Sequence, residues 1–230
     1  SSLELKFKYN MQHTVDELVK AGAHFGYNKS RRHPSIAPYV YSVKNGVDII
    51  NLEKTIESLE EMKKFLADFK GKNVLLVGTK PEAIRAIDNA AMKTGSAFVS
   101  QRWVGGLLTN WSEMKKRVSK LVDFKDKRDK GELGIFTKKE QLEIVKNIGR
   151  MEVNFIGVVG IEKQPEVLIV IDPKKEHVAV KEAFQLGIPV VALANTDCSI
   201  KGIRVAVVAN DASVPSIEYF MSVVTEALSQ

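Results

Sequence analysis

The stretch from 167 to 194 reads VLIVIDPKKEHVAVKEAFQLGIPVVALA, and it determines the fold class. Two short apolar runs, 167–172 and 188–194, flank a segment whose apolar residues recur at helical spacing. Continuous apolar runs of this length are typical of strands that are buried on both faces of a sheet. A strand, a helix from about Lys174 to Leu186 and a second strand form the βαβ unit of a parallel sheet.

The same alternation of strand and helix continues on both sides of this stretch. Apolar runs at 73–78, 96–100 and 204–209 predict three more strands. A helix is expected from Pro81 to about Lys93, and a final helix over SIEYFMSVVTEAL. Five apolar strands that alternate with helices predict an α/β fold with a parallel sheet covered by helices on both faces.

Three features are predicted before the first of these strands. A capping box formed by Thr14 and Glu17 indicates a short helix. YVYSVKNGVDII, with Asn45-Gly46 at its centre, predicts an N-terminal β-hairpin because Asn-Gly favours a tight hairpin turn. The amphipathic stretch LEKTIESLEEMKKFLADFKG predicts a helix that ends at Gly71.

The segment between the strands at 96–100 and 167–172 has no strand pattern. Two stretches, Thr109 to about Arg128 and Thr137 to about Met151, have helical spacing and dense Lys and Arg. They predict an αα-hairpin, residues 109–151, inserted into an α/β domain that is formed by residues 1–108 and 152–230.

Charge is distributed unevenly along the 230 residues, whose formal net charge is +6. Residues 101–150 hold thirteen Lys or Arg against seven Asp or Glu, whereas 151–230 hold six against ten. Such asymmetry indicates a polyanion bound along one part of the molecule, although a solvated helix face explains basic runs equally well. No apolar run approaches the roughly 20 residues that span a bilayer, so no membrane contact is predicted.

Motifs that mark catalysis or cofactor binding are missing. Gly78-Thr79-Lys80 follows a strand, but it lacks the spacing of a phosphate-binding loop, and Pro81 removes a backbone N–H that such a loop uses. No G-x-G-x-x-G, G-x-S-x-G or H-E-x-x-H occurs, and one Cys excludes a Cys-rich zinc site. We predict no catalysis and no cofactor. The alternative is a nucleotide-dependent enzyme with Lys80 or Asp172 near its ligand.

Basic and aromatic residues suited to RNA gather in three places. They are a basic loop that starts at Tyr27, the glycine-containing stretch after the strand at 96–100, and the start of the hairpin's first helix. Arg and Lys contact phosphates, and exposed aromatic rings stack on bases. The residues predicted to contact RNA are Lys29, Arg31, Arg32, Arg102, Trp103, Asn110, Trp111, Lys115, Lys116 and Arg117.

Alternatives remain for two of these places. Trp103 serves equally well as a core residue at the base of the hairpin, and the hairpin could face a protein neighbour instead of RNA. No recognition-helix motif is visible, so folded RNA is favoured over DNA. A protein adaptor that acts through its acidic last third is a further alternative.

Five stretches give the chain a close resemblance to a known family. The run R-W-x-G-G-x-L-T-N, from Arg102 to Asn110, is highly specific to it. The chain resembles the bacterial-type small-subunit ribosomal protein two family from about residue 13 to 229. The five stretches are AGAHFG (21–26), NGVDIINLEKT (45–55), LLVGTK (75–80), RWVGGLLTNW (102–111) and IDPKKEHVAVKEAFQLGIPVVA (171–192).

This resemblance implies a flavodoxin-like α/β domain with an inserted helical hairpin. It implies a structural constituent of the small ribosomal subunit that takes part in translation and assembly without catalysis. The implied partners are small-subunit ribosomal RNA and neighbouring ribosomal proteins, including ribosomal protein one, the large messenger-binding protein. The implied location is the ribosome, in the cytoplasm or in an organelle.

The chain departs from the family pattern where family members carry His and Asp residues that could converge on a cation. Tyr27 replaces a His, and 195–197 reads Asn-Thr-Asp where the family commonly has Asp-Thr-Asn. An aspartate-rich turn is replaced by residues 199–202, Ser-Ile-Lys-Gly. Because acceptors are altered here, we predict that no metal binds.

Overall fold

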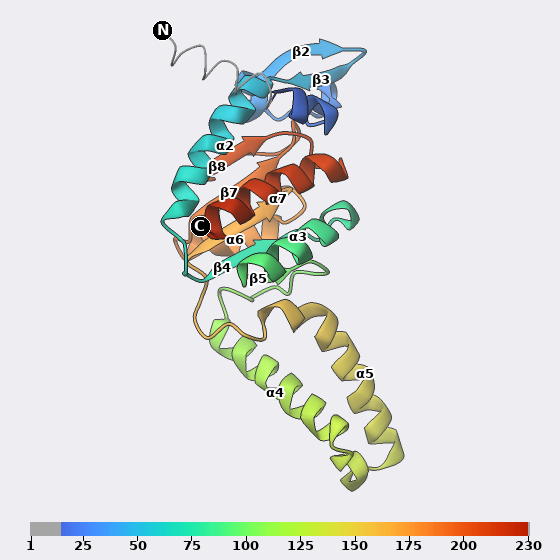
Figure 1. Ribbon diagram of the computed structural model, residues 1–230. Coiled ribbons are helices and arrows are strands. Elements are labelled where there is room, and N and C mark those ends of the chain that lie inside the picture. The colour runs from blue at the N-terminus through green and yellow to red at the C-terminus, as the bar shows by residue number, and fades with distance from the viewer. Residues whose placement is uncertain (1–14, 230) are drawn as a thin grey trace.

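A computed structural model describes residues 15–229 (Figure 1). Its centre is a parallel sheet of five strands in the order β5-β4-β6-β7-β8. In sequence order this is the 2-1-3-4-5 arrangement of flavodoxin-like folds, so the predicted α/β class is confirmed. The strands are β4 (Val74–Val77), β5 (Ala97–Val99), β6 (Val167–Ile171), β7 (Val190–Ala194) and β8 (Val205–Val208).

Helices cover both faces of this sheet, as alternate side chains of the strands require. One face packs against α2 (Leu52–Ala67), α3 (Pro81–Thr94) and α7 (Val214–Ser229). The other face packs against α6 (His177–Gln185) and the base of the hairpin. Among residues 15–229, no helix combines the length and the apolar content that a bilayer span requires.

A smaller antiparallel sheet, ordered β1-β3-β2, lies beyond the β8 edge (Figure 1). Its strands are β1 (Phe25–Asn28), β2 (Val40–Lys44) and β3 (Val47–Ile50). Asn45 and Gly46 both have positive φ, 51° and 78°, as a type I′ turn requires, which confirms the predicted hairpin. Residues 15–20 are helical, and the predicted cap Thr14 lies outside the described residues.

The basic segment after Phe25 differs from the predicted loop. Tyr27 and Asn28 belong to β1, which pairs with β3, and the next residues form a 3-10 turn, η1 (Lys29–Arg31). The strand forms because β3 offers an open edge and the Thr196 hydroxyl accepts a hydrogen bond from the Tyr27 N–H at 2.9 Å. A loop prediction for these two residues was therefore wrong.

The hairpin extends away from the sheet (Figure 1). It consists of α4 (Trp111–Asp129), a short 3-10 turn η3 (Glu132–Ile135) and α5 (Lys138–Phe155). The second helix continues four residues beyond its predicted end and passes into η4 (Ile156–Val158), which lies against β5.

Candidate nucleic-acid interface

The predicted RNA-binding residues fall into two groups at opposite ends of the molecule. One group follows β1, beyond the β8 edge of the main sheet, and the other lies after β5 and along α4 (Figure 1). The structure therefore does not gather them into one patch. Any RNA that contacts both groups must reach around the main sheet.

At the first end, Arg31 lies between a ring and a carboxylate. Its guanidinium lies 4.5 Å from the centre of the Tyr27 ring, and its Nη2 donates to Asp197 Oδ2 at 3.2 Å. The Arg31 side chain remains 55% exposed, so it can still reach a phosphate. The neighbouring Lys29 is also exposed.

Arg32 has a different role in the structure. Its guanidinium donates two hydrogen bonds to the carboxylate of Asp48, whose side chain is fully buried in β3. This bond to Asp48 raises the pKa of Arg32. The pair supplies the positive charge that a buried carboxylate needs, so Arg32 holds the small sheet together and has little capacity left for RNA.

At the second end, a buried carboxylate organises the glycine-containing loop. Glu182 of α6 accepts hydrogen bonds from the backbone N–H groups of this loop and from two of its side chains. Burial alone would raise the pKa of Glu182, but these donors outweigh it and lower the pKa. The donors are Gly106 N, Leu108 N, Thr109 N, Thr109 Oγ1 and Trp103 Nε1, at 2.8–3.2 Å.

The aromatic residues of this stretch are structural in large part. Trp103 and Trp111 are half-buried and pack on the second face of the sheet, and Trp103 also donates to Glu182. Of the two readings of Trp103, the geometry favours a core residue at the hairpin base. Arg102 and Asn110 are exposed beside them.

Along α4 the basic side chains point outward. Lys116 and Arg117 are exposed, and Lys116 pairs with Glu113 one turn earlier at 2.6 Å. Lys120 lies one turn further on the same face as Lys116. Lys115 instead donates to the backbone carbonyl of Glu162 at 2.8 Å and ties the helix to the loop that returns to β6.

The carboxyl edge of the sheet holds a buried cluster of charges. Lys80, after β4, lies 2.6 Å from Asp172 Oδ2 and 2.9 Å from Asp211 Oδ2. Burial opposes the charge of both carboxylates; the contact with Lys80 nevertheless lowers the pKa of Asp172, whereas burial raises that of Asp211. Lys80 thus joins the ends of β4, β6 and β8, and its ammonium group is engaged in internal ion pairs.

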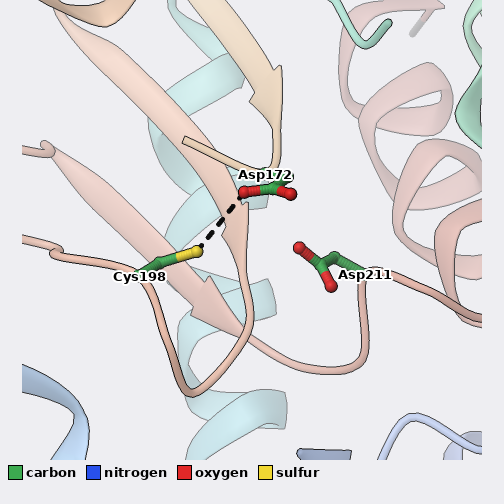
Figure 2. A group of neighbouring side chains, drawn as sticks. All are labelled: Asp172, Cys198 and Asp211. Atoms are coloured by element: carbon green, nitrogen blue, oxygen red, sulfur yellow. Dashed lines mark hydrogen bonds between the residues drawn. The ribbon is translucent and has the colours of Figure 1, made fainter. Parts of the chain in front are cut away.

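Cys198 completes this cluster (Figure 2). Its thiol lies 3.6 Å from Asp172 Oδ1, and burial raises its pKa, so it stays a neutral thiol. Single potential ligand atoms of Asp172, Cys198 and Asp211 lie within 4.8 Å of one another. The ammonium group of Lys80 already pairs with both carboxylates, so a cation would have to displace it. That no metal binds stays a prediction.

Two functional features of the structure were not predicted from the sequence. Glu182 organises a loop that lies 73–79 residues earlier in the chain, and Asp48 is the partner of Arg32. Neither carboxylate belongs to a local motif. The one signal was the presence of Glu182 on a helix that the apolar pattern had already placed against the sheet.

These features together define a class: an α/β scaffold that carries a basic helical hairpin and whose carboxyl edge is closed by internal ion pairs. A sequence model of the family described as Ribosomal protein S2 matches residues 18–230. The chain belongs to this family, and it is a structural component of the small ribosomal subunit rather than an enzyme.

Individual relatives support this membership. The chain is 36% identical over 216 residues to small ribosomal subunit protein uS2 of Chloroflexus aggregans, which covers 93% of this chain and 91% of the relative. It is 38% identical over 217 residues to uS2 of Petrotoga mobilis, with 94% and 75% covered. It is 37% identical over 216 residues to uS2 of Dictyoglomus thermophilum, with 93% and 88% covered.

Proposed function

We propose that this chain is held on small-subunit ribosomal RNA by two separate contacts at opposite ends of the molecule. One contact consists of Lys29 and Arg31 after β1. The other consists of Arg102, Asn110 and the outward basic residues of α4. The observation that carries this proposal is the exposure of these side chains in two groups on opposite sides of the main sheet.

Not all ten predicted residues contribute equally to this proposal. Arg32, Trp103, Trp111 and Lys115 each have an internal partner or packing site, so their contribution to RNA binding is mainly to hold the exposed residues in place. Lys116 and Arg117 carry the direct phosphate contacts of the hairpin. Each such contact adds affinity that does not depend on base sequence and that weakens with salt.

We further infer that residues 109–151 act as an inserted unit on the α/β domain of 1–108 and 152–230. The neighbouring proteins of the subunit, including ribosomal protein one where present, are the expected protein partners. The expected location is a ribosome in the bacterial cytoplasm, since the similar proteins named above come from bacteria.

The hairpin contact is tested by neutralising its charges. In the triple variant Lys116→Gln, Arg117→Gln, Lys120→Gln, the slope of log affinity for small-subunit RNA against log salt should fall by about one per residue removed. The matched control is Lys64→Gln, Lys70→Gln, Lys93→Gln, whose exposed lysines lie on or near α2 and α3. Equal slopes for both variants would refute the assigned role of α4.

A further inference from the structure

The outward face of α5 carries apolar side chains that the rest of the described chain leaves uncovered. Leu142 is 73% exposed, Val145 45%, Val153 54% and Ile156 59%. The first three lie on α5, and Ile156 follows its last residue at the start of η4. Their spacing of three, eight and three residues places them along one side. Ile148, on the other side, is buried against α4. These four exposed residues are called the α5 stripe below.

The α5 stripe differs in chemistry from the outward face of α4. Lys116, Arg117 and Lys120 make the α4 face basic. The side chains of the stripe are apolar, and their removal from water lowers the free energy. A sugar–phosphate backbone cannot cover such a surface with apolar groups. A row of exposed apolar side chains along a helix is typical of a surface that contacts a protein.

Gly149 lies in the middle of the stripe, one turn from both Val145 and Val153. A glycine inside a helix is less favourable than an alanine, because it loses more backbone freedom on folding. Internal packing does not explain it, because a Cβ at this position would meet no atom within 4 Å. An exposed glycine in an apolar face lets the backbone of a second helix approach closely, and such an approach explains why the glycine is tolerated here.

One edge of the stripe is basic. Helical spacing places Lys139, Lys146 and Arg150 along this edge, with Glu143 between Lys139 and Lys146. All four are exposed, and the edge has a net positive charge. Acidic side chains on a partner would therefore be attracted along the same edge. A second copy of this chain docked antiparallel on α5 would bring the basic edge against itself, which is unfavourable.

We propose that the α5 stripe docks an amphipathic α-helix of a neighbouring protein. The contact face of that helix is apolar and passes close to Gly149, and the edge that meets Lys139, Lys146 and Arg150 carries Asp or Glu. This is the mode in which a helix lays its apolar face on a hydrophobic surface. The contact is independent of the RNA contact on α4, and the two helices of the hairpin serve different partners.

Photo-crosslinking in purified, assembled small subunits tests the proposal. The residue p-benzoylphenylalanine replaces Val153 in one protein. In a second protein it replaces Lys116, which reports on the RNA contact proposed for α4. The position-153 adduct should survive ribonuclease and contain a protein segment with apolar residues at helical spacing and acidic residues along one edge. The proposal would be overturned if position 153 formed adducts with RNA or with a second copy, or formed no adduct at all. A cross-linked segment without that acidic edge would also overturn it.

Substitution of Gly149 separates docking from folding. Gly149→Ala should raise the melting temperature of the isolated chain, because alanine is the better helix former and its methyl group meets no other atom. The same substitution should lower the yield of the position-153 protein adduct several-fold. Gly134→Ala, at the hairpin tip, is the control and should leave this yield unchanged, since its Cβ also meets nothing. An unchanged yield with Gly149→Ala would contradict the close approach.

Discussion

Gly157 lies where the hairpin rejoins the sheet, and its missing side chain is a packing requirement. A Cβ on Gly157 would lie 2.1 Å from the backbone oxygen of Phe98 in β5. We expect Gly157→Ala to destabilise the protein by about 1–3 kcal/mol, as overpacking does elsewhere. Urea unfolding would measure this loss.

Gly160 provides the control for that substitution. It lies three residues further on, and a Cβ there would meet no atom within 4 Å. Gly160→Ala should leave the unfolding midpoint nearly unchanged. If both variants lost the same stability, close packing against Phe98 would not be the cause.

Glu182 links the pH dependence of stability to the loop at 103–109. Its pKa is lowered in the folded protein, so its contribution is present above the unfolded pKa and is lost as the pH falls through the folded value. Glu182→Gln should cost about 1–3 kcal/mol at neutral pH, because a buried donor loses its acceptor. The variant should also lose less stability than the parent between neutral pH and pH 4.

Thermal unfolding as a function of pH would measure both effects. Glu176→Gln is a useful comparison, since Glu176 is also buried on the same side of the sheet but accepts from Thr79 rather than from the loop. If the melting temperatures of the parent and Glu182→Gln fell equally as the pH was lowered, the Glu182 carboxylate would not stabilise the fold through its charge.

At the scale of single residues, the sequence indicates which basic residues are exposed, but it does not indicate which buried groups they bond to. Lys29, Arg102 and Arg117 could be proposed because they lie in basic, polar segments, and the structure leaves them exposed. The internal roles of Arg32 and Trp103 could not be predicted. Their acceptors, Asp48 and Glu182, are brought to them only by the tertiary fold.

At the scale of elements, the central strands β4, β6 and β7 were predictable because each is a short, wholly buried apolar run. The start of α6 was not. The helix begins at His177, three residues later than expected, because Asp172 adopts a left-handed φ of 64° and its carboxylate accepts from the N–H groups of Lys174 and Lys175. Aspartate tolerates this conformation because it bonds its own backbone locally.

The strand ends depend on Lys80 in a way that can be measured. Lys80→Met leaves Asp172 and Asp211 buried together without a positive charge, so we expect a loss of about 3–5 kcal/mol. Asp211→Asn added to Lys80→Met should restore part of this loss, because it removes one of the two charges.

Denaturant unfolding of the parent, the single variant and the double variant gives the required comparison. The matched control is Lys93→Met, which removes an exposed lysine from the end of α3. A double variant no more stable than Lys80→Met alone would show that charge pairing at the strand ends is not what Lys80 contributes.

At the scale of the whole molecule, the sheet separates the two proposed RNA contacts, and the hairpin carries the proposed protein contact. The β1 group and the α4 group lie at opposite ends, so the chain can bridge segments of RNA that are apart in the folded subunit (Figure 1). Length, composition and net charge do not predict such an arrangement. It follows from the strand order, which places β5 and β8 at the two edges.

Hydroxyl-radical footprinting of small-subunit RNA tests this central claim most directly. The parent protein should protect two separate regions of RNA. Lys29→Gln with Arg31→Gln should remove one protected region, and Lys116→Gln with Arg117→Gln and Lys120→Gln should remove the other. A single protected region that both variants weaken alike would contradict a molecule that holds RNA at its two ends.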